Sequence, residues 1–259
     1  MCRHLGYLGP AVPVAELLYD TPHSLVHQSY APTDMRGGGT VNVDGFGVGW
    51  YPAPGADAVR YRRAGPIWAD ANLAAVTRAT VSGAVLAAVR NGTVGMPVVD
   101  TACAPFTDGR WLFSHNGRIA DWPESVADLA KSLPVTDLLT LDAPTDAALL
   151  WALVRRLLAA GGHPTDVLAT VVAEVAQAAP GSRLNLLLTN GTVLVGTTWT
   201  HSLWVRSTPD SVALASEPWD TDERWQEIPN GSVVTAGAHP STVDVRPLDR
   251  GPRGRTGTQ

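Results

Sequence analysis

The segment LNLLLTNGTVLVGTTW, residues 184–199, contains the strongest hairpin signal in the chain. Two apolar runs flank Asn190-Gly191, and an Asn-Gly pair between such runs favours a tight turn between antiparallel strands. Further short apolar runs follow in SLWV (202–205), SVALAS (211–216) and SVVTAG (232–237). The last third of the sequence therefore predicts antiparallel β-structure.

The middle of the chain predicts helices. One begins at Thr145 or Asp146 and another at Pro164, the latter ending at Pro180-Gly181, while a short helix is expected from Pro123. The longer helix that begins near Thr145 shows a stripe of apolar residues at helical spacing, at Leu149, Leu150, Leu153 and Leu157.

The first third is expected to contain strands joined by long loops. VNVDGFGVGWY (41–51) and SGAVLAAVR (82–90) are two such strands. A third runs from Trp111 to about His115 and is closed by an Asn116-Gly117 turn. Strands, then helices, then strands do not alternate as a doubly wound parallel sheet requires. Two packed, mainly antiparallel sheets flanked by helices fit the order better.

Composition excludes several classes of protein. The 259 residues are 45% hydrophobic and 17% charged, which is typical of a soluble globular protein with a substantial core. A net charge of −5 argues against nucleic acid or an anionic membrane as a partner. The longest apolar stretch, residues 147–160, is too short to span a bilayer and contains Arg155 and Arg156. No secretory signal is expected, and two cysteines suit a reducing cytoplasm.

Cys2 follows the initiator methionine directly. If Met1 is removed, this residue carries both a thiol and a free α-amino group. A thiolate is the attacking species in cysteine chemistry, and an α-amino group has a reference pKa of about 7.7–8.0, so it is partly neutral at pH 7 and can take the thiol proton. The pair would form a nucleophile with its own base. The alternative is that a cysteine stands here by chance.

Three other stretches offer matching chemistry. Arg90 ends an apolar strand in VRNGTVG (89–95), where its planar fork suits a carboxylate, although a surface ion pair is the ordinary alternative. Asn116-Gly117 could present an amide and a backbone N–H to a developing oxyanion, or only a turn. Asp146 in PTDAALL opens a helix, where capping is the default role of a carboxylate.

The order of these motifs resembles the class II glutamine amidotransferases, which are N-terminal-nucleophile hydrolases. They are a leading Cys2, then R-x-x-T-x-G (90–95), then H-N-G (115–117), then T-D (145–146) at a helix start. The resemblance implies an α+β fold, a four-layer α/β/β/α sandwich, as a single domain over residues 2–245. Residues 246–259, which are rich in Arg, Gly and Pro, are expected to form a disordered tail.

The resemblance also implies roles for individual residues. The thiol of the N-terminal cysteine would attack the substrate carbonyl, with its own amino group as base. Asn116 and Gly117 would form the oxyanion hole. Arg90, with Thr93 nearby, would hold the substrate α-carboxylate, and Asp146 its α-ammonium. One departure is Gly92, where the family commonly has alanine.

Longer stretches are similar to one branch of this family, the stand-alone γ-glutamyl hydrolases of ergothioneine biosynthesis. They are TPHSLVHQSYAP (21–32), MRGGGTVNVDGFGVGWY (35–51), LNLLLTNG (184–191), ASEPWD (215–220) and RWQEIPNG (224–231). The branch implies a small-molecule substrate, γ-glutamyl-hercynylcysteine sulfoxide, cleaved to glutamate and hercynylcysteine sulfoxide. Two alternatives stay open, a glutaminase subunit that supplies ammonia to a partner synthase and a binding module without activity.

No metal or cofactor is expected. His23 and His27 have the i, i+4 spacing of metal ligands, but no HExxH motif or nearby carboxylate accompanies them. Cys103 is interpreted as a small buried residue. An aromatic side chain such as Trp50 or Trp122 could contact the trimethylammonium group that hercynine carries. The sequence leaves open whether the chain forms a homo-oligomer.

Overall fold

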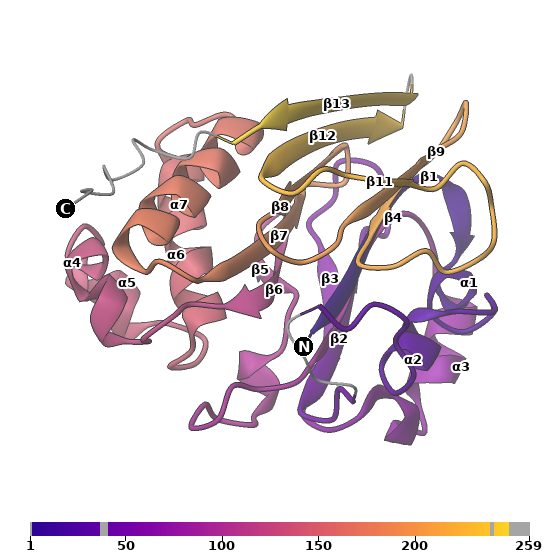
Figure 1. The fold of residues 1–259 in the computed structure, drawn as a ribbon. Coiled ribbons are helices and arrows are strands. Elements are labelled where there is room, and N and C mark those ends of the chain that lie inside the picture. The colour runs from indigo at the N-terminus through magenta and orange to yellow at the C-terminus, as the bar shows by residue number, and fades with distance from the viewer. Residues whose placement is uncertain (1, 37–40, 239–240, 249–259) are drawn as a thin grey trace.

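Two antiparallel β-sheets pack face to face in the computed structural model, which describes residues 2–36, 41–238 and 241–248 (Figure 1). The seven-stranded sheet has the order β11-β9-β10-β1-β4-β2-β3, and the six-stranded sheet has the order β13-β12-β8-β7-β6-β5. The strands of the first are β1 (Arg3–Pro13), β2 (Gly45–Trp50), β3 (Val59–Arg63), β4 (Val81–Arg90), β9 (Trp204–Ser207), β10 (Val212–Ala215) and β11 (Gln226–Glu227). Those of the second are β5 (Phe106–Asp108), β6 (Trp111–Arg118), β7 (Arg183–Thr189), β8 (Val193–Thr198), β12 (Ser232–Ala238) and β13 (Ser241–Pro247).

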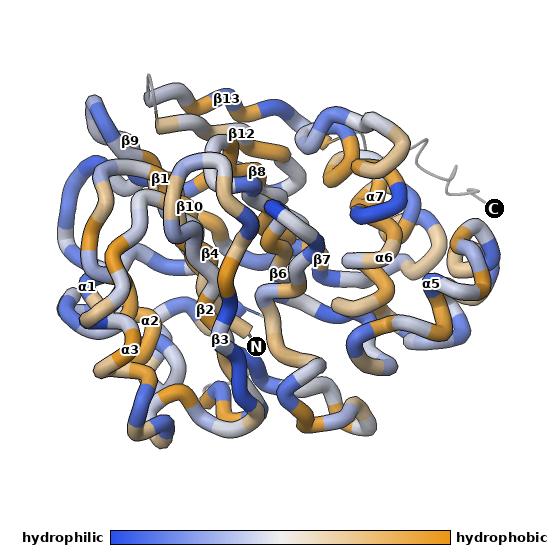
Figure 2. Tube along the Cα trace, turned by 180° about the vertical axis from the view of Figure 1, so that it is seen from behind, coloured by the Kyte–Doolittle hydropathy of each residue, from blue (hydrophilic) through white to orange (hydrophobic). Residues whose placement is uncertain are grey.

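Helices cover the outer face of each sheet. Three short helices pack on the seven-stranded sheet, namely α1 (Val14–Leu18), α2 (Leu25–Gln28) and α3 (Leu73–Ala79). The longer α6 (Asp146–Ala159) and α7 (Pro164–Ala178) pack on the six-stranded sheet, with α4 (Ala127–Ala130) and α5 (Val135–Leu139) beside them. Figure 2 shows hydrophobic residues recurring along α6 and α7.

Strand alternation divides the core into three apolar layers. In β4, Val85 faces the helices while Leu86 faces the other sheet; in β7, Leu186 faces the helices and Leu187 the other sheet. Both faces of these central strands are buried, which explains why their sequences read as nearly continuous apolar runs. The expected four-layer α/β/β/α sandwich is therefore confirmed.

The strongest local signals are also confirmed. β7 and β8 form the expected hairpin, and Asn190 Oδ1 in its turn accepts hydrogen bonds from the backbone N–H groups of Thr192 and Val193, both at 3.1 Å. The helix expected at Thr145 or Asp146 begins at Asp146, because the Thr145 hydroxyl caps it by accepting from Ala148 N at 3.3 Å. The helix expected at Pro164 begins there.

Other expectations differ from the structure. The Asn116-Gly117 pair does not form a turn, because β6 continues to Arg118 and Gly117 pairs with Leu184 of β7. The short helix expected from Pro123 is present, although its first turn, Glu124–Val126, is 3₁₀ and continues directly as α4. The expectation of strands and loops alone in the first third missed α1, α2 and α3.

At the C-terminal end, β13 runs to Pro247 and Leu248 is buried, so ordered structure extends past residue 245. Residues 249–259 of the expected tail lie outside the described residues. No described helix has the length and apolar character that crossing a membrane requires.

Candidate active site

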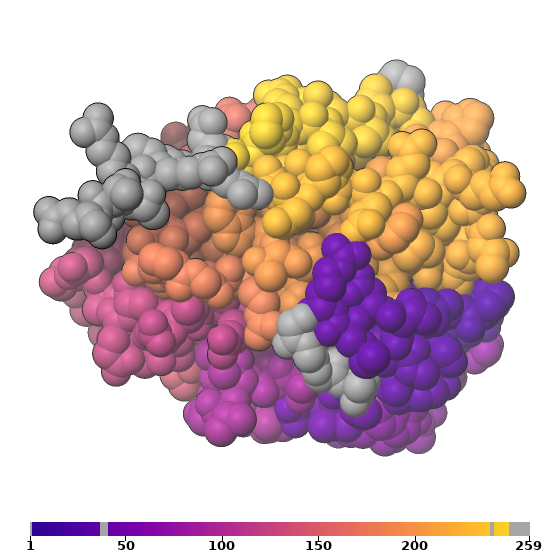
Figure 3. Space-filling model, viewed as in Figure 1, coloured from indigo at the N-terminus to yellow at the C-terminus, as the bar shows by residue number. Residues whose placement is uncertain are grey.

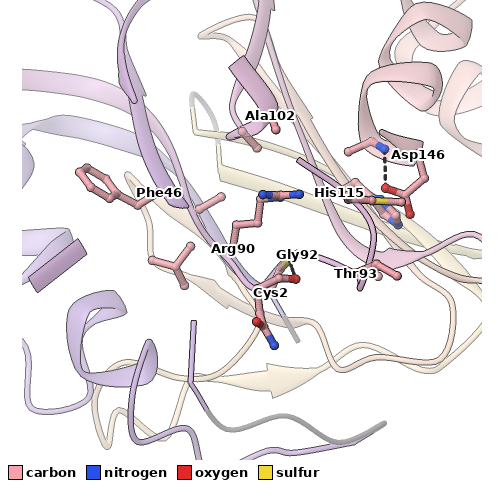
Figure 4. A pocket seen from close by; sticks show the side chains of 15 residues that line it. Cys2, Phe46, Arg90, Gly92, Thr93, Ala102, His115 and Asp146 are labelled. Carbon is pink, nitrogen blue, oxygen red and sulfur yellow. Dashed lines mark hydrogen bonds between the residues drawn. The ribbon is translucent and has the colours of Figure 1, made fainter. Parts of the chain in front are cut away.

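Cys2 immediately precedes β1, a central strand of the seven-stranded sheet, and lies at the wall of a small pocket (Figure 4). Five of the six residues selected from the sequence line this pocket: Cys2, Arg90, Thr93, Gly117 and Asp146. Apart from Thr93, which lies in the loop after β4, they stand at or next to the ends of β1, β4, β6 and α6, and the packing of the two sheets brings them together.

Arg90 is the last residue of β4, and its guanidinium lies in the pocket wall. Nη1 donates weakly to the Asp44 carbonyl at 3.4 Å, whereas Nη2 is buried and has no hydrogen-bond partner among the described residues. A Cβ at Gly92 would lie 3.1 Å from Nη2, so the glycine leaves room around the guanidinium. An unsatisfied buried donor of this kind is costly unless a ligand completes it.

Asp146 is the first residue of α6 and is only 5% exposed. Its carboxylate accepts hydrogen bonds from Ile119 N at 3.0 Å and from Ala147 N at 2.7 Å. Since Ile119 directly follows β6, the carboxylate joins the helix to the strand that carries Gly117. The positive end of the helix dipole also attracts a carboxylate placed at the start of a helix.

Gly117 is required where it stands. Its φ is +157°, and a Cβ there would lie 1.8 Å from the Arg183 carbonyl oxygen and 2.8 Å from His115 Nε2. The glycine therefore allows the backbones of β6 and β7 to approach closely beside the pocket.

Asn116 does not line the pocket and lies buried between the sheets. Its Nδ2 donates to Ser216 Oγ at 3.3 Å, and Ser216 Oγ also accepts from His4 N at 3.0 Å. Through Ser216, the Asn116 amide is thus linked to β1, the strand that directly follows Cys2. Each amide nitrogen carries two N–H donors, so the bond to Ser216 uses only one of them.

A buried ion pair that no local sequence motif indicates holds the backbone of Cys2. Arg3 Nη1 donates to the Cys2 carbonyl at 3.0 Å, and Arg3 Nε pairs with Glu217 Oε1 at 2.6 Å. Oε2 of the same carboxylate contacts His23 Nε2 at 2.8 Å and accepts from Thr33 N and Oγ1 at 2.8 and 2.6 Å. Figure 3 shows the N-terminal segment, in indigo and purple, against the last third of the chain, in orange.

The charge state of this network follows from its contacts. Burial opposes ionisation of Glu217, but hydrogen bonds from His23 and Thr33 and the nearby Arg3 lower its pKa to about 2. Arg3 directly follows Cys2, and Glu217 lies in the ASEPWD stretch (215–220), but neither segment by itself indicates that the two residues form an ion pair.

Two histidines beside the site are uncharged at neutral pH. Burial, with His115 and His201 nearby, lowers the pKa of His4 to about 3, and burial with Arg183 nearby does the same for His201. No described histidine forms a hydrogen bond with the Cys2 thiol, which instead contacts the Asn91 carbonyl oxygen at 3.8 Å. The arrangement therefore supplies no histidine base to the thiol.

The remaining sequence candidates do not line the pocket. The expectation that no carboxylate lies near the two histidines is wrong, because His23 contacts Glu217 at 2.8 Å. His23 and His27 are also hydrogen-bonded to each other through Nδ1 at 3.0 Å, yet the part of the chain that the structure describes contains no group of three His, Cys, Asp or Glu residues able to hold a metal. Cys103 is buried as expected, and burial raises the pKa of its thiol to about 11. Trp50 and Trp122 pack against apolar layers instead of lining the pocket.

The sequence matches a known protein family and is similar to two proteins of named activity. The family model of the class-II glutamine amidotransferases matches residues 17–212. A γ-glutamyl-hercynylcysteine sulfoxide hydrolase of Mycolicibacterium smegmatis is 41% identical over 249 residues, which cover 96% of this chain and all of that protein. One of Mycobacterium tuberculosis is 40% identical over 253 residues, covering 98% of this chain and all of the relative.

Solved structures show the same fold at low identity. A glutamine aminotransferase class-II domain protein from Silicibacter pomeroyi superposes with a TM-score of 0.67 at 24% identity, covering 96% of this chain and all of that one. The glutamine phosphoribosylpyrophosphate amidotransferase of B. subtilis gives 0.65 at 13% identity, covering 96% of this chain and 49% of that one.

Proposed function

The chain belongs to the class-II glutamine amidotransferases, and we propose that it hydrolyses the γ-glutamyl amide of γ-glutamyl-hercynylcysteine sulfoxide, releasing glutamate and hercynylcysteine sulfoxide in ergothioneine biosynthesis. Two relatives named for this hydrolysis align over their whole length at about 40% identity, which supports the substrate. The reducing cytoplasm suits a thiol nucleophile, and we place the reaction there.

One observation carries the proposal. A single pocket contains a thiol, an arginine with an unpartnered buried donor and a helix-start carboxylate, at Cys2, Arg90 and Asp146. A glutamyl group carries an α-carboxylate and an α-ammonium at one end and the scissile carbonyl at the other. Arg90, with Thr93 beside it, would bind the carboxylate and Asp146 the ammonium, leaving the γ-carbonyl for the thiol.

The reaction would take place in two steps. After Met1 is removed, the Cys2 α-amino group takes the thiol proton and the thiolate attacks the γ-carbonyl carbon. Asn116 Nδ2 and Gly117 N–H stabilise the oxyanion, the C–N bond breaks, and the α-ammonium protonates the departing amine. Water then attacks the thioester with the same amino group as base, and glutamate leaves.

Arg3 and Glu217 support this chemistry without touching the substrate. The hydrogen bond from Arg3 to the Cys2 carbonyl fixes the backbone of the nucleophile, and the buried carboxylate fixes Arg3. Such fixed geometry lowers the entropy that the enzyme must lose to reach the transition state.

Two measurements test the proposal. Intact mass should show that Met1 is absent, and glutamate release should be faster from γ-glutamyl-hercynylcysteine sulfoxide than from glutamine. Cys2→Ala should abolish release, while Cys103→Ala, which removes the other thiol, should retain it. An active chain that still carries Met1 would refute the mechanism. Equal or faster turnover of glutamine would instead favour a glutaminase subunit that supplies ammonia to a synthase.

A further inference from the structure

The residues described so far bind the glutamyl half of the substrate, which glutamine and γ-glutamyl conjugates share. The two differ only in the departing amine. It is ammonia in one case, and in the other an amino acid with a carboxylate next to its nitrogen. Selection between them must therefore come from residues on the other side of Cys2. The inference that follows rests on the proposed function.

Two arginines face each other across the strand pair that borders the pocket. Arg118 is the last residue of β6 and follows Gly117 directly, and Arg183 is the first residue of β7. They are direct register partners. Directly opposed residues of antiparallel strands have Cβ atoms about 4.5–5.5 Å apart, and like charges at such positions destabilise a sheet. An anion bound between the two guanidinium groups would offset that repulsion.

The alternation of β6 gives the direction of Arg118. Ser114, Asn116 and Arg118 share one face of the strand, because successive side chains point to opposite faces. Ser114 Oγ contacts His4 Nδ1 at 3.2 Å, and Asn116 Nδ2 donates to Ser216, so this face is turned towards the seven-stranded sheet and the strand of Cys2. Arg118 therefore lies on the side of the nucleophile, one residue beyond Gly117.

Electrostatics agree with this placement. Burial lowers the pKa of Arg183, Arg118 lowers it further, and the Cys2 thiol acts in the opposite direction. Arg183 thus interacts with both its cross-strand partner and the nucleophile. Arg118 is exposed and forms no ion pair with any described residue, so its guanidinium is accessible.

We propose that Arg118 and Arg183 form an anion subsite beside Cys2 that binds the carboxylate next to the scissile nitrogen, and so selects γ-glutamyl amino acids over glutamine. An arginine fork binds a carboxylate through two parallel hydrogen bonds. The subsite acts on the departing half alone, so its contribution is absent when ammonia leaves.

The test compares three substrates in the full-length enzyme. They are γ-glutamylcysteine, the matching amide of cysteamine that lacks the carboxylate, and glutamine. Arg118→Gln should lower kcat/KM for γ-glutamylcysteine by roughly 10- to 100-fold, the range expected for a hydrogen bond to a charged group. Turnover of the other two substrates should change less than about twofold, and Arg118→Lys should recover part of the loss because the charge is retained.

Arg110→Gln is the matched control. This exposed arginine directly precedes the opposite end of β6, where its Nη2 contacts the Asn190 carbonyl oxygen, so it should change none of the three rates. An equal loss for all three substrates in Arg118→Gln, or no loss for γ-glutamylcysteine, would overturn the subsite. Failure of the proposed function is visible separately, since wild-type enzyme would then release glutamate from glutamine at least as fast as from γ-glutamyl-hercynylcysteine sulfoxide.

Discussion

Replacing Glu217 with glutamine should destabilise the protein in a way that depends on pH. The carboxylate is 1% exposed and accepts or shares four close contacts, at 2.6–2.8 Å, from Arg3, His23 and Thr33. Glu217→Gln keeps the shape of the side chain but removes the charge, leaving the buried Arg3 guanidinium uncompensated. Breaking a buried pair in this way typically costs about 3–5 kcal/mol.

The pKa shift of Glu217 gives a second value for the free energy that this carboxylate contributes to folding. Folding lowers the pKa of Glu217 from 4.5 to about 2, and at about 1.4 kcal/mol per pKa unit this corresponds to roughly 3 kcal/mol of folding free energy. Because the folded-state pKa is depressed, this stabilisation is present in full above about pH 4.5 and is lost as the pH falls towards 2. The cost of breaking the buried ion pair and the free energy obtained from the pKa shift are therefore similar.

Urea unfolding of wild type and Glu217→Gln at pH 7 and pH 3 measures the effect. The difference in the free energy of unfolding should be about 3 kcal/mol at pH 7 and less than half of that at pH 3. Glu227→Gln is the control, since Glu227 pairs with Arg36 at 2.6 Å but is 40% exposed, and it should cost less than about 1 kcal/mol. A Glu217→Gln difference below about 1 kcal/mol at pH 7, or one that is the same at both pH values, would refute the reasoning.

Two further substitutions test the proposed oxyanion hole of Asn116 and Gly117. Ser216→Ala should lower kcat about tenfold with little change in KM, because the hydroxyl orients the Asn116 amide, and should add little to Asn116→Ala in the double variant. Ser82→Ala is the control: this buried serine is hydrogen-bonded to strand backbone away from the pocket, so kcat should not change. If the losses in Ser216→Ala and Asn116→Ala add in the double variant, Ser216 does not act through Asn116. Gly117→Ala should lower activity about 100-fold or more, since the new Cβ would clash with the Arg183 carbonyl oxygen and displace the strand. Near-wild-type kinetics would contradict this prediction, because they would show that the backbone adjusts without loss of activity.

Whether an element could be predicted from the sequence depended on how many consecutive residues carry its pattern. The hairpin at Asn190-Gly191 and the helices α6 and α7 carry their turn residues, caps and apolar stripes within one segment, so local chemistry identifies them. By contrast, α1, α2 and α3 have seven residues or fewer. An apolar period of 3.6 cannot be recognised over so few residues, and such helices are stabilised mainly by the sheet on which they pack.

The same dipeptide gave one correct and one wrong interpretation. Asn190-Gly191 forms a turn, but Asn116-Gly117 lies inside β6, where the glycine admits the Arg183 backbone and the asparagine points between the sheets. Local sequence is alike in the two places. The difference is set by the neighbouring strand β7, which lies some seventy residues away, and only the folded structure contains that information. The oxyanion role proposed for Asn116 and Gly117 therefore does not depend on the turn predicted for them.

The links between the parts of the site follow from strand register. β1 pairs antiparallel with β10, with Leu5 opposite Ala215. Continued by two residues, this register sets His4 opposite Ser216 and Arg3 opposite Glu217. The Ser216 hydroxyl then connects the His4 backbone to Asn116, while Glu217 holds Arg3 against the Cys2 carbonyl.

A slip of one residue would exchange the faces of Ser216 and Glu217. The carboxylate would then point between the sheets and the hydroxyl towards Arg3, so both links would be lost. No local pattern around Arg3 or in ASEPWD (215–220) specifies that pairing, because the two segments are about 210 residues apart in the sequence. The apolar layers on either side of β1 fix the register, and the geometry of the nucleophile therefore depends on how the sandwich core packs.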